Sequence, residues 1–321
     1  MNLLLVLQKG MAFLLSALYA APTQTTDPPK IQGYVFVKRS HQASPYSLGV
    51  YKNKQGKPVF IKAAQSHWYN LYYHNLLFEA RILKQSCGIT FRGQTVSFPQ
   101  LVETRSENGY FIVVTRFISG KDLSNFPLTQ QLQKYKEVVT FLQKQKLPGV
   151  PKKNGIFFLA VLPFIFLLAL VKHPTDRSAI VRAFGYIVKN YAEFLARHRL
   201  ILTHADLHME NIKVYKRQLA LFDLAQMMYT FAEYEVITTL SSTRNSNQFN
   251  ELLLRHLLTV NGSLRRFTSL LLMYCSLHNL TSTAEPKKLR RYRQLLDLGI
   301  ATYKRSEQKP VVEIGVKGNP L

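Results

Sequence analysis

Three side chains between positions 206 and 223 have the types and spacing needed for proton transfer and metal binding. Residues 211–215 and 219–223 read as two short strands with a three-residue connection, and this register places Asn211 opposite Asp223. Directly opposed strand positions have Cβ atoms about 5 Å apart, so one hard cation could bind oxygens of both side chains. Asp206 would lie at the mouth of the same site. A carboxylate there can accept the proton of an attacking hydroxyl during phosphoryl transfer, while magnesium neutralises charge on the phosphoryl group.

The spacing His204-x-Asp206-x-x-x-x-Asn211, followed by Asp223 at a strand end, resembles the catalytic and metal loops of the protein-kinase-like superfamily. It is most similar to the small-molecule branch, which contains aminoglycoside phosphotransferases, choline kinases and lipopolysaccharide sugar kinases. The resemblance implies that Asp206 is the catalytic base, that Asn211 and Asp223 bind Mg²⁺, and that ATP is the phosphoryl donor. It also implies a structural role for His204, and for His208 it favours loop packing over catalysis. The alternative is an ordinary hairpin whose Asp and Asn serve turn chemistry.

Charge and cysteine content restrict the class of protein. The 321 residues contain 42 Lys and Arg against 18 Asp and Glu, which gives a formal net charge of +24. Such an excess attracts nucleic acid, anionic lipid or phosphorylated substrates. No regular basic–aromatic repeat is present, so a nucleic-acid partner is not expected. The two cysteines, Cys87 and Cys275, have no metal-ligand spacing and form no disulfide framework, which favours a reducing compartment. Nothing in the sequence assigns an oligomeric state.

Ahead of this motif, the sequence predicts a small antiparallel sheet followed by a helix. Residues 34–38, 47–52 and 57–63 read as strands, and residues 53–56 supply the turn between the last two. A helix is expected over 66–85, with Ser66 as its N-cap.

A lysine–glutamate pair is expected between this sheet and this helix. Glu79 lies on the helix's apolar stripe, which consists of Trp68, Tyr72, Leu76 and Leu83. A carboxylate on such a face needs a partner, since an unpaired buried charge costs several kcal/mol. Lys62 is the natural partner, and the two resemble the strand lysine and helix glutamate that orient ATP phosphates in kinases. The alternative places both charges in solvent.

Two further segments are expected to bind the nucleotide. The loop 39–46 has no G-x-G-x-x-G pattern, which many small-molecule kinases also lack, and leaves Ser40 and Ser44 as candidates for covering the phosphates. Residues 109–120 read as a long strand that resembles the kinase hinge, where the backbone from Thr115 to Phe117 would hold adenine.

An apolar segment interrupts the second half of the chain. A helix over 128–146 and a break over 148–155 precede sixteen apolar residues at 156–171. As a helix this run would span about 24 Å, against a hydrocarbon core of about 30 Å. One crossing would separate Lys62 from Asp206, so the run is expected to re-enter from one face, lie at the interface or be buried. Pro163 favours a bent or hairpin shape, and the basic residues at both ends favour a cytoplasmic location for each end. The alternative is a core helix.

Other segments complete this interpretation. Residues 1–30 form an apolar tail, whose first 21 residues favour an interfacial anchor over a signal peptide or a mis-set start. Residues 178–199 are expected to form one helix leading to the catalytic loop, and later helices are expected at 246–260 and 263–277. The basic helix from residue 287 either helps to dock the chain on an anionic membrane or is simply solvated.

The expected fold is α+β and kinase-like, with two lobes. An antiparallel-sheet N-lobe spans 31–119, and a mainly helical C-lobe spans 120–312 and carries an apolar insert at 148–175. Asp223 is followed by Leu and Ala instead of Phe-Gly, and no Ala-Pro-Glu follows, so a small-molecule enzyme is expected rather than a regulated protein kinase. The expected substrate is a sugar, glycolipid or lipid-linked head group at the cytoplasmic side of a membrane. The alternatives are a soluble aminoglycoside- or choline-type kinase and a pseudokinase-like nucleotide-binding module.

Overall fold

The chain forms two compact units of different architecture. The computed structural model describes residues 29–40, 46–67, 70–86, 96–215, 218–258 and 262–308, with the backbone alone described at 256–258, 262–264 and 308. The predicted anchor (1–21), Ser44, Trp68 and Cys87 lie outside these residues. The sheet unit runs through Leu123 and includes Lys146–Val150 and Asn211–Gln226; the helical unit comprises Ser124–Gln145, Pro151–Glu210 and the chain from Met227 onward. The domain boundaries given by the sequence stay a prediction.

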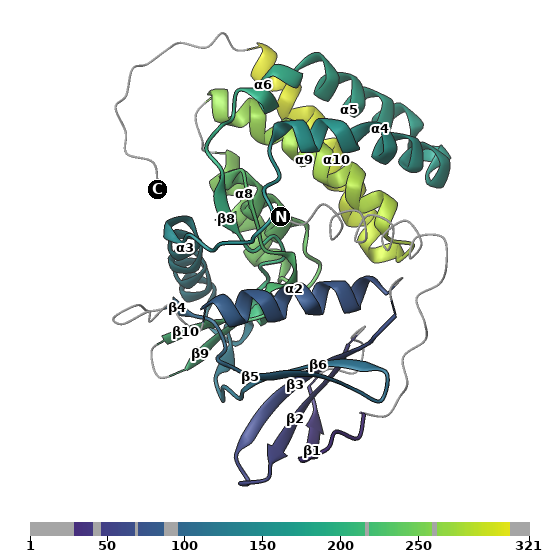
Figure 1. Cartoon of the computed structure of the whole chain (residues 1–321). Coiled ribbons are helices and arrows are strands. Elements are labelled where there is room, and N and C mark those ends of the chain that lie inside the picture. The colour runs from purple at the N-terminus through teal and green to yellow at the C-terminus, as the bar shows by residue number, and fades with distance from the viewer. Residues whose placement is uncertain are drawn as a thin grey trace. The chain divides into compact units, whose positions relative to one another are not determined.

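The sheet unit is built on the predicted antiparallel strands. Its five-stranded sheet has the order β1-β2-β3-β6-β5 (Figure 1). The turn before β3 forms because the Asn53 side chain accepts hydrogen bonds from the Gln55 and Lys57 backbone amides, while Gly56 takes a φ of 75°. The strands are β1 (Tyr34–Arg39), β2 (Ser47–Asn53), β3 (Pro58–Gln65), β5 (Leu101–Glu107) and β6 (Tyr110–Arg116).

Alternation along β3 gives the sheet two different faces. Val59, Ile61 and Ala63 are buried in a cluster with Ile112 and Val114 of β6. Lys62 points the other way, because successive side chains of a strand face opposite sides. Helix α2 (Leu71–Ser86) packs against strands β3 and β6, and its Tyr73 meets the Phe111 ring edge-on at 5.9 Å.

Helix α2 begins five residues later than the sequence suggested. Ser66 and His67 are not helical, and Asn70 instead supplies the cap, because its side-chain oxygen accepts a hydrogen bond from the Tyr72 amide at 3.0 Å. The Asn70 amide group also donates to the Gln65 carbonyl at 2.9 Å, which ties the cap to the end of β3.

A second sheet in this unit corrects the predicted hairpin by one residue. Its order is β4-β10-β9-β7, from β4 (Val96–Ser97), β10 (Gln218–Leu221), β9 (Ile212–Tyr215) and β7 (Lys121–Asp122). Tyr215 pairs with Gln218, not Leu219, and the Phe222 amide bonds the Asn211 carbonyl at 2.8 Å. Asn211 therefore lies opposite Phe222 and not Asp223. Gln218 therefore belongs to the ladder, whereas the prediction had placed it in the connection.

The helical unit is organised around one buried helix. Helix α9 (Gly262–Ser282) packs against α4, α5, α7 and α10, and its Phe267, Leu270, Leu271 and Leu277 are fully buried. The described helices agree with the expected ones at 128–146, 246–260 and 263–277. They are α3 (Leu128–Lys144), α4 (Gly155–Lys172), α5 (Arg177–Lys189), α6 (Tyr191–Leu195), α7 (Ala232–Ser241), α8 (Asn247–Leu258), α9 and α10 (Pro286–Gln308), with the short strands β8 (Ile201–Thr203) and β11 (Met228–Thr230).

The apolar run forms a single helix, so the hairpin alternative is wrong. Helix α4 continues through Pro163, and Asn154 caps it by accepting a hydrogen bond from the Phe157 amide at 3.1 Å. An interior proline removes one backbone hydrogen bond, and here the buried stripe formed by Phe158, Leu162, Ile165 and Ala169 keeps the helix intact. Within the part of the chain that the structure describes, α4 is the one helix long and apolar enough to cross a membrane by length and composition.

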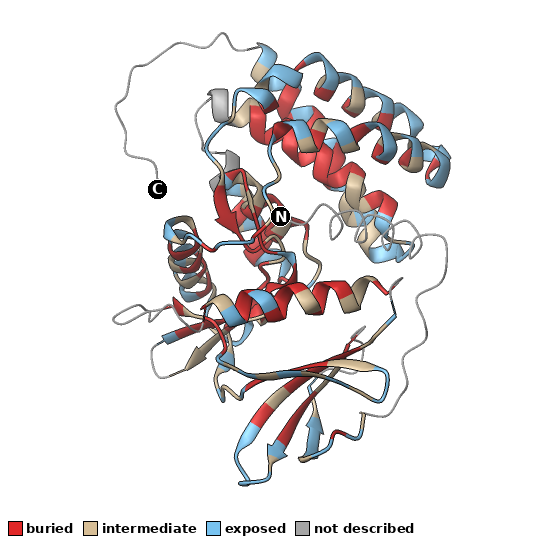
Figure 2. Cartoon of the chain, in the orientation of Figure 1, coloured by how far each residue is buried: buried red, intermediate tan, exposed pale blue. Residues whose placement is uncertain are grey.

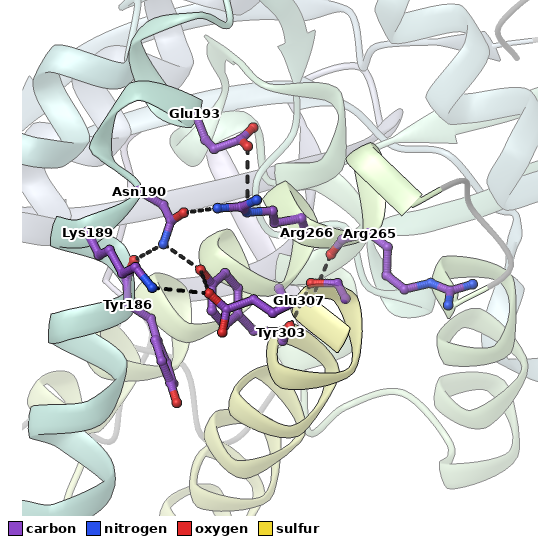
Figure 3. Close-up of polar contacts among 10 residues, drawn as sticks. Tyr186, Lys189, Asn190, Glu193, Arg265, Arg266, Tyr303 and Glu307 are labelled. Carbon is purple, nitrogen blue, oxygen red and sulfur yellow. Dashed lines mark hydrogen bonds and ion pairs between the residues drawn. The ribbon is translucent and has the colours of Figure 1, made fainter. Parts of the chain in front are cut away.

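The helix expected over 178–199 is interrupted at Asn190. Its side chain donates hydrogen bonds to the Tyr186 carbonyl at 2.7 Å and to the Tyr303 hydroxyl at 2.6 Å, and accepts one from Arg266 (Figure 3). Arg266 also pairs with Glu193 at 3.7 Å. A buried amide that bonds its own preceding turn competes with the helical pattern, and the chain restarts as α6. The network fastens the α5–α6 junction to α9 and α10.

Candidate functional site

Lys62 is the centre of a buried charged cluster in the sheet unit. Its ammonium nitrogen lies 2.7 Å from Glu79 of α2 and 2.7 Å from Asp223, which follows β10. The ring of Tyr46 covers it, with the nitrogen 4.1 Å from the ring centre. The structure thus brings together three of the residues singled out in the sequence, and rules out the alternative in which Lys62 and Glu79 face solvent.

The cluster keeps Lys62 charged. Burial disfavours the ammonium, but the charges of Asp223 and Glu79 outweigh it and raise the Lys62 pKa. Burial also raises the Glu79 pKa, an effect that Lys62 and a hydrogen bond from the Leu224 amide oppose. The result is a fixed positive charge held by two acids, of which Asp223 is the more accessible, at 33% side-chain exposure.

Asp223 owes its position to an unusual backbone conformation. Its φ is 57°, a left-handed conformation that few residues other than glycine adopt and that Asp tolerates better than most. The chain leaves β10 at this residue, so the side chain turns toward Lys62 instead of continuing the alternation of the strand. Asn211, buried immediately before β9, accepts a hydrogen bond at its backbone carbonyl from the Phe222 amide.

The donor atoms of Asn211 and Asp223 fit a magnesium ion. Mg²⁺ prefers oxygen ligands and is commonly bound by one or two carboxylates together with substrate phosphates and water. An amide and a carboxylate from one hairpin supply such oxygens, whereas no cluster of three or more His, Cys, Asp or Glu side chains occurs among the described residues. Asn211 and Asp223 are therefore the residues that would hold such an ion, together with the phosphates of a bound nucleotide.

The loop that carries Asp206 is anchored inside the helical unit. Buried Glu235 of α7 accepts hydrogen bonds from the backbone amides of His204 and, at 3.3 Å, Ala205. Ala205 has a φ of 62°, a strained conformation for a residue with a Cβ. Asp206 is partly exposed and its carbonyl accepts the His208 amide at 3.0 Å. The loop geometry is thus fixed while the Asp206 carboxylate stays accessible.

His208 is a buried part of the same loop. Arg244 lies 2.9 Å from its Nε2, and because arginine can only donate, Nε2 accepts and carries no proton. Nδ1 is 4.0 Å from Glu210. The Met209 amide donates to the Asn245 side chain at 3.1 Å. This environment agrees with a packing role for His208, which stays a prediction.

Two further predicted site residues, Thr115 and Phe117, lie in and just after β6 of the sheet unit. Thr115 is buried in β6, where it pairs with Phe60 on one side and Leu101 on the other. Phe117 follows the end of β6 and is half-buried. Their role toward adenine stays a prediction.

Sequence reasoning missed Tyr46, Glu235 and Asn245. Each acts on a residue at least 16 positions away, as Tyr46 does on Lys62, and none belongs to a recognisable motif. The available signal was weak: Glu235 lies on α7 between two residues that a helical pattern would bury, Phe231 and Thr239.

Titration of Glu235 is expected to make the helical unit pH-sensitive. Burial raises the pKa of Glu235 from 4.5 to about 7, against the two backbone hydrogen bonds that lower it. The folded unit therefore holds a proton that the unfolded chain has released, so the free energy of unfolding should fall as pH rises from about 4.5 to 7 and then level off. Urea unfolding of wild type and Glu235→Gln across this range measures the effect, which the variant should lack. Glu233→Gln is the matched control, and an unchanged fall in Glu235→Gln would assign the effect to another group.

Comparison with known proteins identifies the class of fold. No family sequence model matches the chain, and no curated protein matches it by sequence. A candidate fructosamine-3-kinase from Haemophilus somnus is similar in structure, with a TM-score of 0.53 and 12% identity over 83% of this chain and 92% of that chain. A choline/ethanolamine kinase family protein from Mesorhizobium loti gives a TM-score of 0.50 and 14% identity over 94% of this chain and 96% of that one.

These likenesses confirm the expected fold class. The chain has the α+β fold of these kinases, with an antiparallel-sheet unit and a mainly helical unit. At such low sequence identity these likenesses establish the fold alone. The chemistry has to be argued from the residues of the site.

Proposed function

We propose that this protein is an ATP- and Mg²⁺-dependent phosphotransferase that phosphorylates a hydroxyl group of a small molecule. The observation that carries the proposal is the Lys62 ammonium held at 2.7 Å from both Glu79 and Asp223. An ordinary hairpin or solvated pair would not maintain a buried cation between two acids, one of which lies 161 residues along the chain from that cation. Such an arrangement suits a polyanionic ligand, because the incoming phosphates can share the lysine with Glu79 while Asp223 turns to a metal ion.

Each residue has a distinct role in the proposed reaction. Lys62 binds ATP phosphates and Glu79 fixes its position. Asn211 and Asp223 hold Mg²⁺, which when bound neutralises charge on the transferred phosphoryl group. The backbone from Thr115 to Phe117 receives the adenine.

Asp206 serves as proton acceptor for the substrate hydroxyl. The hydroxyl oxygen forms a bond to the γ-phosphorus, the bond from that phosphorus to the ADP oxygen breaks, and the hydroxyl proton passes to the Asp206 carboxylate. The hydrogen bonds from His204 and Ala205 to Glu235 hold the loop, so the carboxylate is oriented before substrate binds.

The acceptor that we propose is a sugar, a glycolipid or another lipid-linked head group, with the protein at the cytoplasmic side of a membrane. The net charge of +24 and the apolar helix α4 support this substrate class. A soluble kinase of the aminoglycoside or choline type is the second candidate, favoured by the structural likeness to a choline/ethanolamine kinase family protein. A pseudokinase-like nucleotide-binding module is the third.

Phosphoryl transfer from γ-labelled ATP to a panel of hydroxyl acceptors tests the proposal. The panel should contain monosaccharides, amino sugars, amino alcohols and lipid-linked sugars, each with Mg²⁺ and with a chelator. Labelled product that appears only with Mg²⁺ is expected. Nucleotide binding without metal-dependent consumption of ATP would support the pseudokinase alternative and contradict the proposal.

A further inference from the structure

We propose that helices α4 and α5 form a docking surface for an anionic lipid bilayer, with α4 lying along the membrane interface. The proposal concerns the helical unit alone and does not depend on phosphotransferase activity. It rests on the exposed side chains of the two helices, on the charges around them, and on the contacts that hold them in place.

The outward face of α4 is apolar along its whole length. A stripe of α4 packs against α9 and α6, and near the start of this stripe the centre of the Phe158 ring lies 4.8 Å from that of Tyr274. The opposite face carries Ile156, Ala160, Pro163, Phe164, Leu167 and Val171, all of them exposed (Figure 2). Phe164 is 67% exposed and Val171 79%. The solvent side of a surface helix is ordinarily polar, so an 18-residue helix without one polar side chain on this face indicates a non-aqueous partner.

The apolar face continues onto α5. The rings of Phe166 and Phe184 stack with their centres 4.0 Å apart and so connect α4 to α5. Beyond that contact, Val181 and Val188 are exposed and lie seven residues apart, on one side of α5. The surface is therefore wider than a single helix.

Basic residues border this surface. Arg182 follows one of the exposed valines, and Arg177 and Lys152 are also exposed, whereas Lys189, which follows the other valine, pairs with Glu307 of α10 at 3.4 Å. Between residues 152 and 192 the only acidic side chain is Asp176, and it is paired with Arg293 at 2.7 Å. An apolar strip with a basic margin is complementary to an anionic leaflet, whose head groups attract lysine and arginine while the acyl region accepts apolar side chains.

The packing of α4 favours an interfacial position over a crossing. Crossing would strip Phe158, Leu162 and Ile165 from a protein core in which each is at most 3% exposed. The Asn190 network fastens the end of α5 to α9 and α10, so the surface is held as one rigid face (Figure 3). An interfacial helix inserts only its outer side chains into the bilayer. The packing of α4 and α5 leaves those outer side chains exposed.

The charges also argue against a second copy of the chain as the occupant. A two-fold interface places the same patch against itself, so the basic margin of one copy would face that of the other. A bilayer carries the opposite charge and meets no such repulsion.

Vesicle flotation of the full chain tests the proposal. Wild type is expected to float with phosphatidylcholine vesicles that contain phosphatidylglycerol, and less with phosphatidylcholine alone. Phe164→Gln combined with Leu167→Gln should weaken binding at least about tenfold, since both side chains would leave the acyl region. Arg177→Gln and Arg182→Gln should each cost roughly fivefold, and only on the anionic vesicles.

Matched controls distinguish the loss of the α4–α5 docking surface from misfolding and from membrane binding through other parts of the chain. Val35→Gln changes a side chain of the sheet unit whose exposed fraction, 69%, is similar to the 67% of Phe164. This variant should bind vesicles as wild type does. A photoreactive probe dissolved in the bilayer should label peptides from residues 155–189 and spare those from β1 to β3. Wild-type binding by the Phe164/Leu167 variant, labelling confined to other segments, or a vesicle-independent dimer that the variant abolishes would each overturn the proposal.

Discussion

Replacing Asp206 with asparagine is expected to lower kcat by about 10²- to 10⁴-fold, the usual contribution of a positioned proton acceptor. The amide has the same shape but cannot take up the hydroxyl proton at neutral pH. The loop should keep its conformation, because its hydrogen bonds to Glu235 come from the backbone amides of His204 and Ala205. The nucleotide Kd, measured by calorimetry, should therefore stay near the wild-type value while turnover is lost.

The neighbouring carboxylate of Glu210 provides the control for this loss. It lies four residues further along the same loop, partly exposed and 4.0 Å from His208. Glu210→Gln should retain most of the activity. Turnover by Asp206→Asn close to that of wild type would remove Asp206 from the mechanism.

Replacing Lys62 with methionine is expected to abolish activity and also to lower the free energy of unfolding by about 3–5 kcal/mol. The lost stability comes from Glu79, which is 7% exposed and would be left as a buried carboxylate without its cation. Activity is lost because the ATP phosphates would no longer have the positive charge of Lys62 to bind them. Denaturant unfolding and the phosphoryl-transfer assay measure the two effects separately.

A second replacement separates these two contributions. Lys62→Met combined with Glu79→Leu removes the orphaned carboxylate, so stability should recover while activity stays absent. Lys213→Met is the control for a lysine in an accessible pair: its partner Asp122 is also 2.7 Å away, but both side chains are about one-third exposed. That change should cost at most about 1 kcal/mol. Activity in the double variant would contradict the role of Lys62.

The sequence predicted the pairing of Lys62 with Glu79 because buried charge is costly. Glu79 stood on an apolar helical stripe, and such a carboxylate needs a cation. The strands around Lys62 were equally accessible to prediction, since Asn53 and Gly56 mark the turn and apolar side chains alternate along β3.

The hairpin register and the start of α2 depended on three-dimensional geometry that the sequence pattern does not determine. The hairpin register was wrong by one residue, because residues 219–222 are all apolar and therefore offer no alternation that would fix the pairing. The start of α2 was misplaced since Ser66 and Asn70 are both good caps, and only the tie from Asn70 to Gln65 decides between them.

Long-range partners explain what the sequence did not show at the candidate site. Glu235 accepts hydrogen bonds from the Asp206 loop, 30 residues away in the sequence. No motif around Glu235 indicates this role. Helix α4 is a related case: its sequence is apolar on all sides, and tertiary packing alone determines which stripe is buried against α9 and which stays exposed.

Binding of Mn²⁺ in the presence of a non-hydrolysable ATP analogue, followed by electron paramagnetic resonance, tests the central claim most directly. Mn²⁺ is a spectroscopic substitute for Mg²⁺ with the same preference for oxygen ligands. Asn211→Ala and Asp223→Asn should each weaken nucleotide-dependent Mn²⁺ binding at least about tenfold, while Asp122→Asn, in the same unit, should leave it unchanged. Equal Mn²⁺ affinity in wild type and in both variants would contradict the metal site, and with it the proposed phosphotransferase.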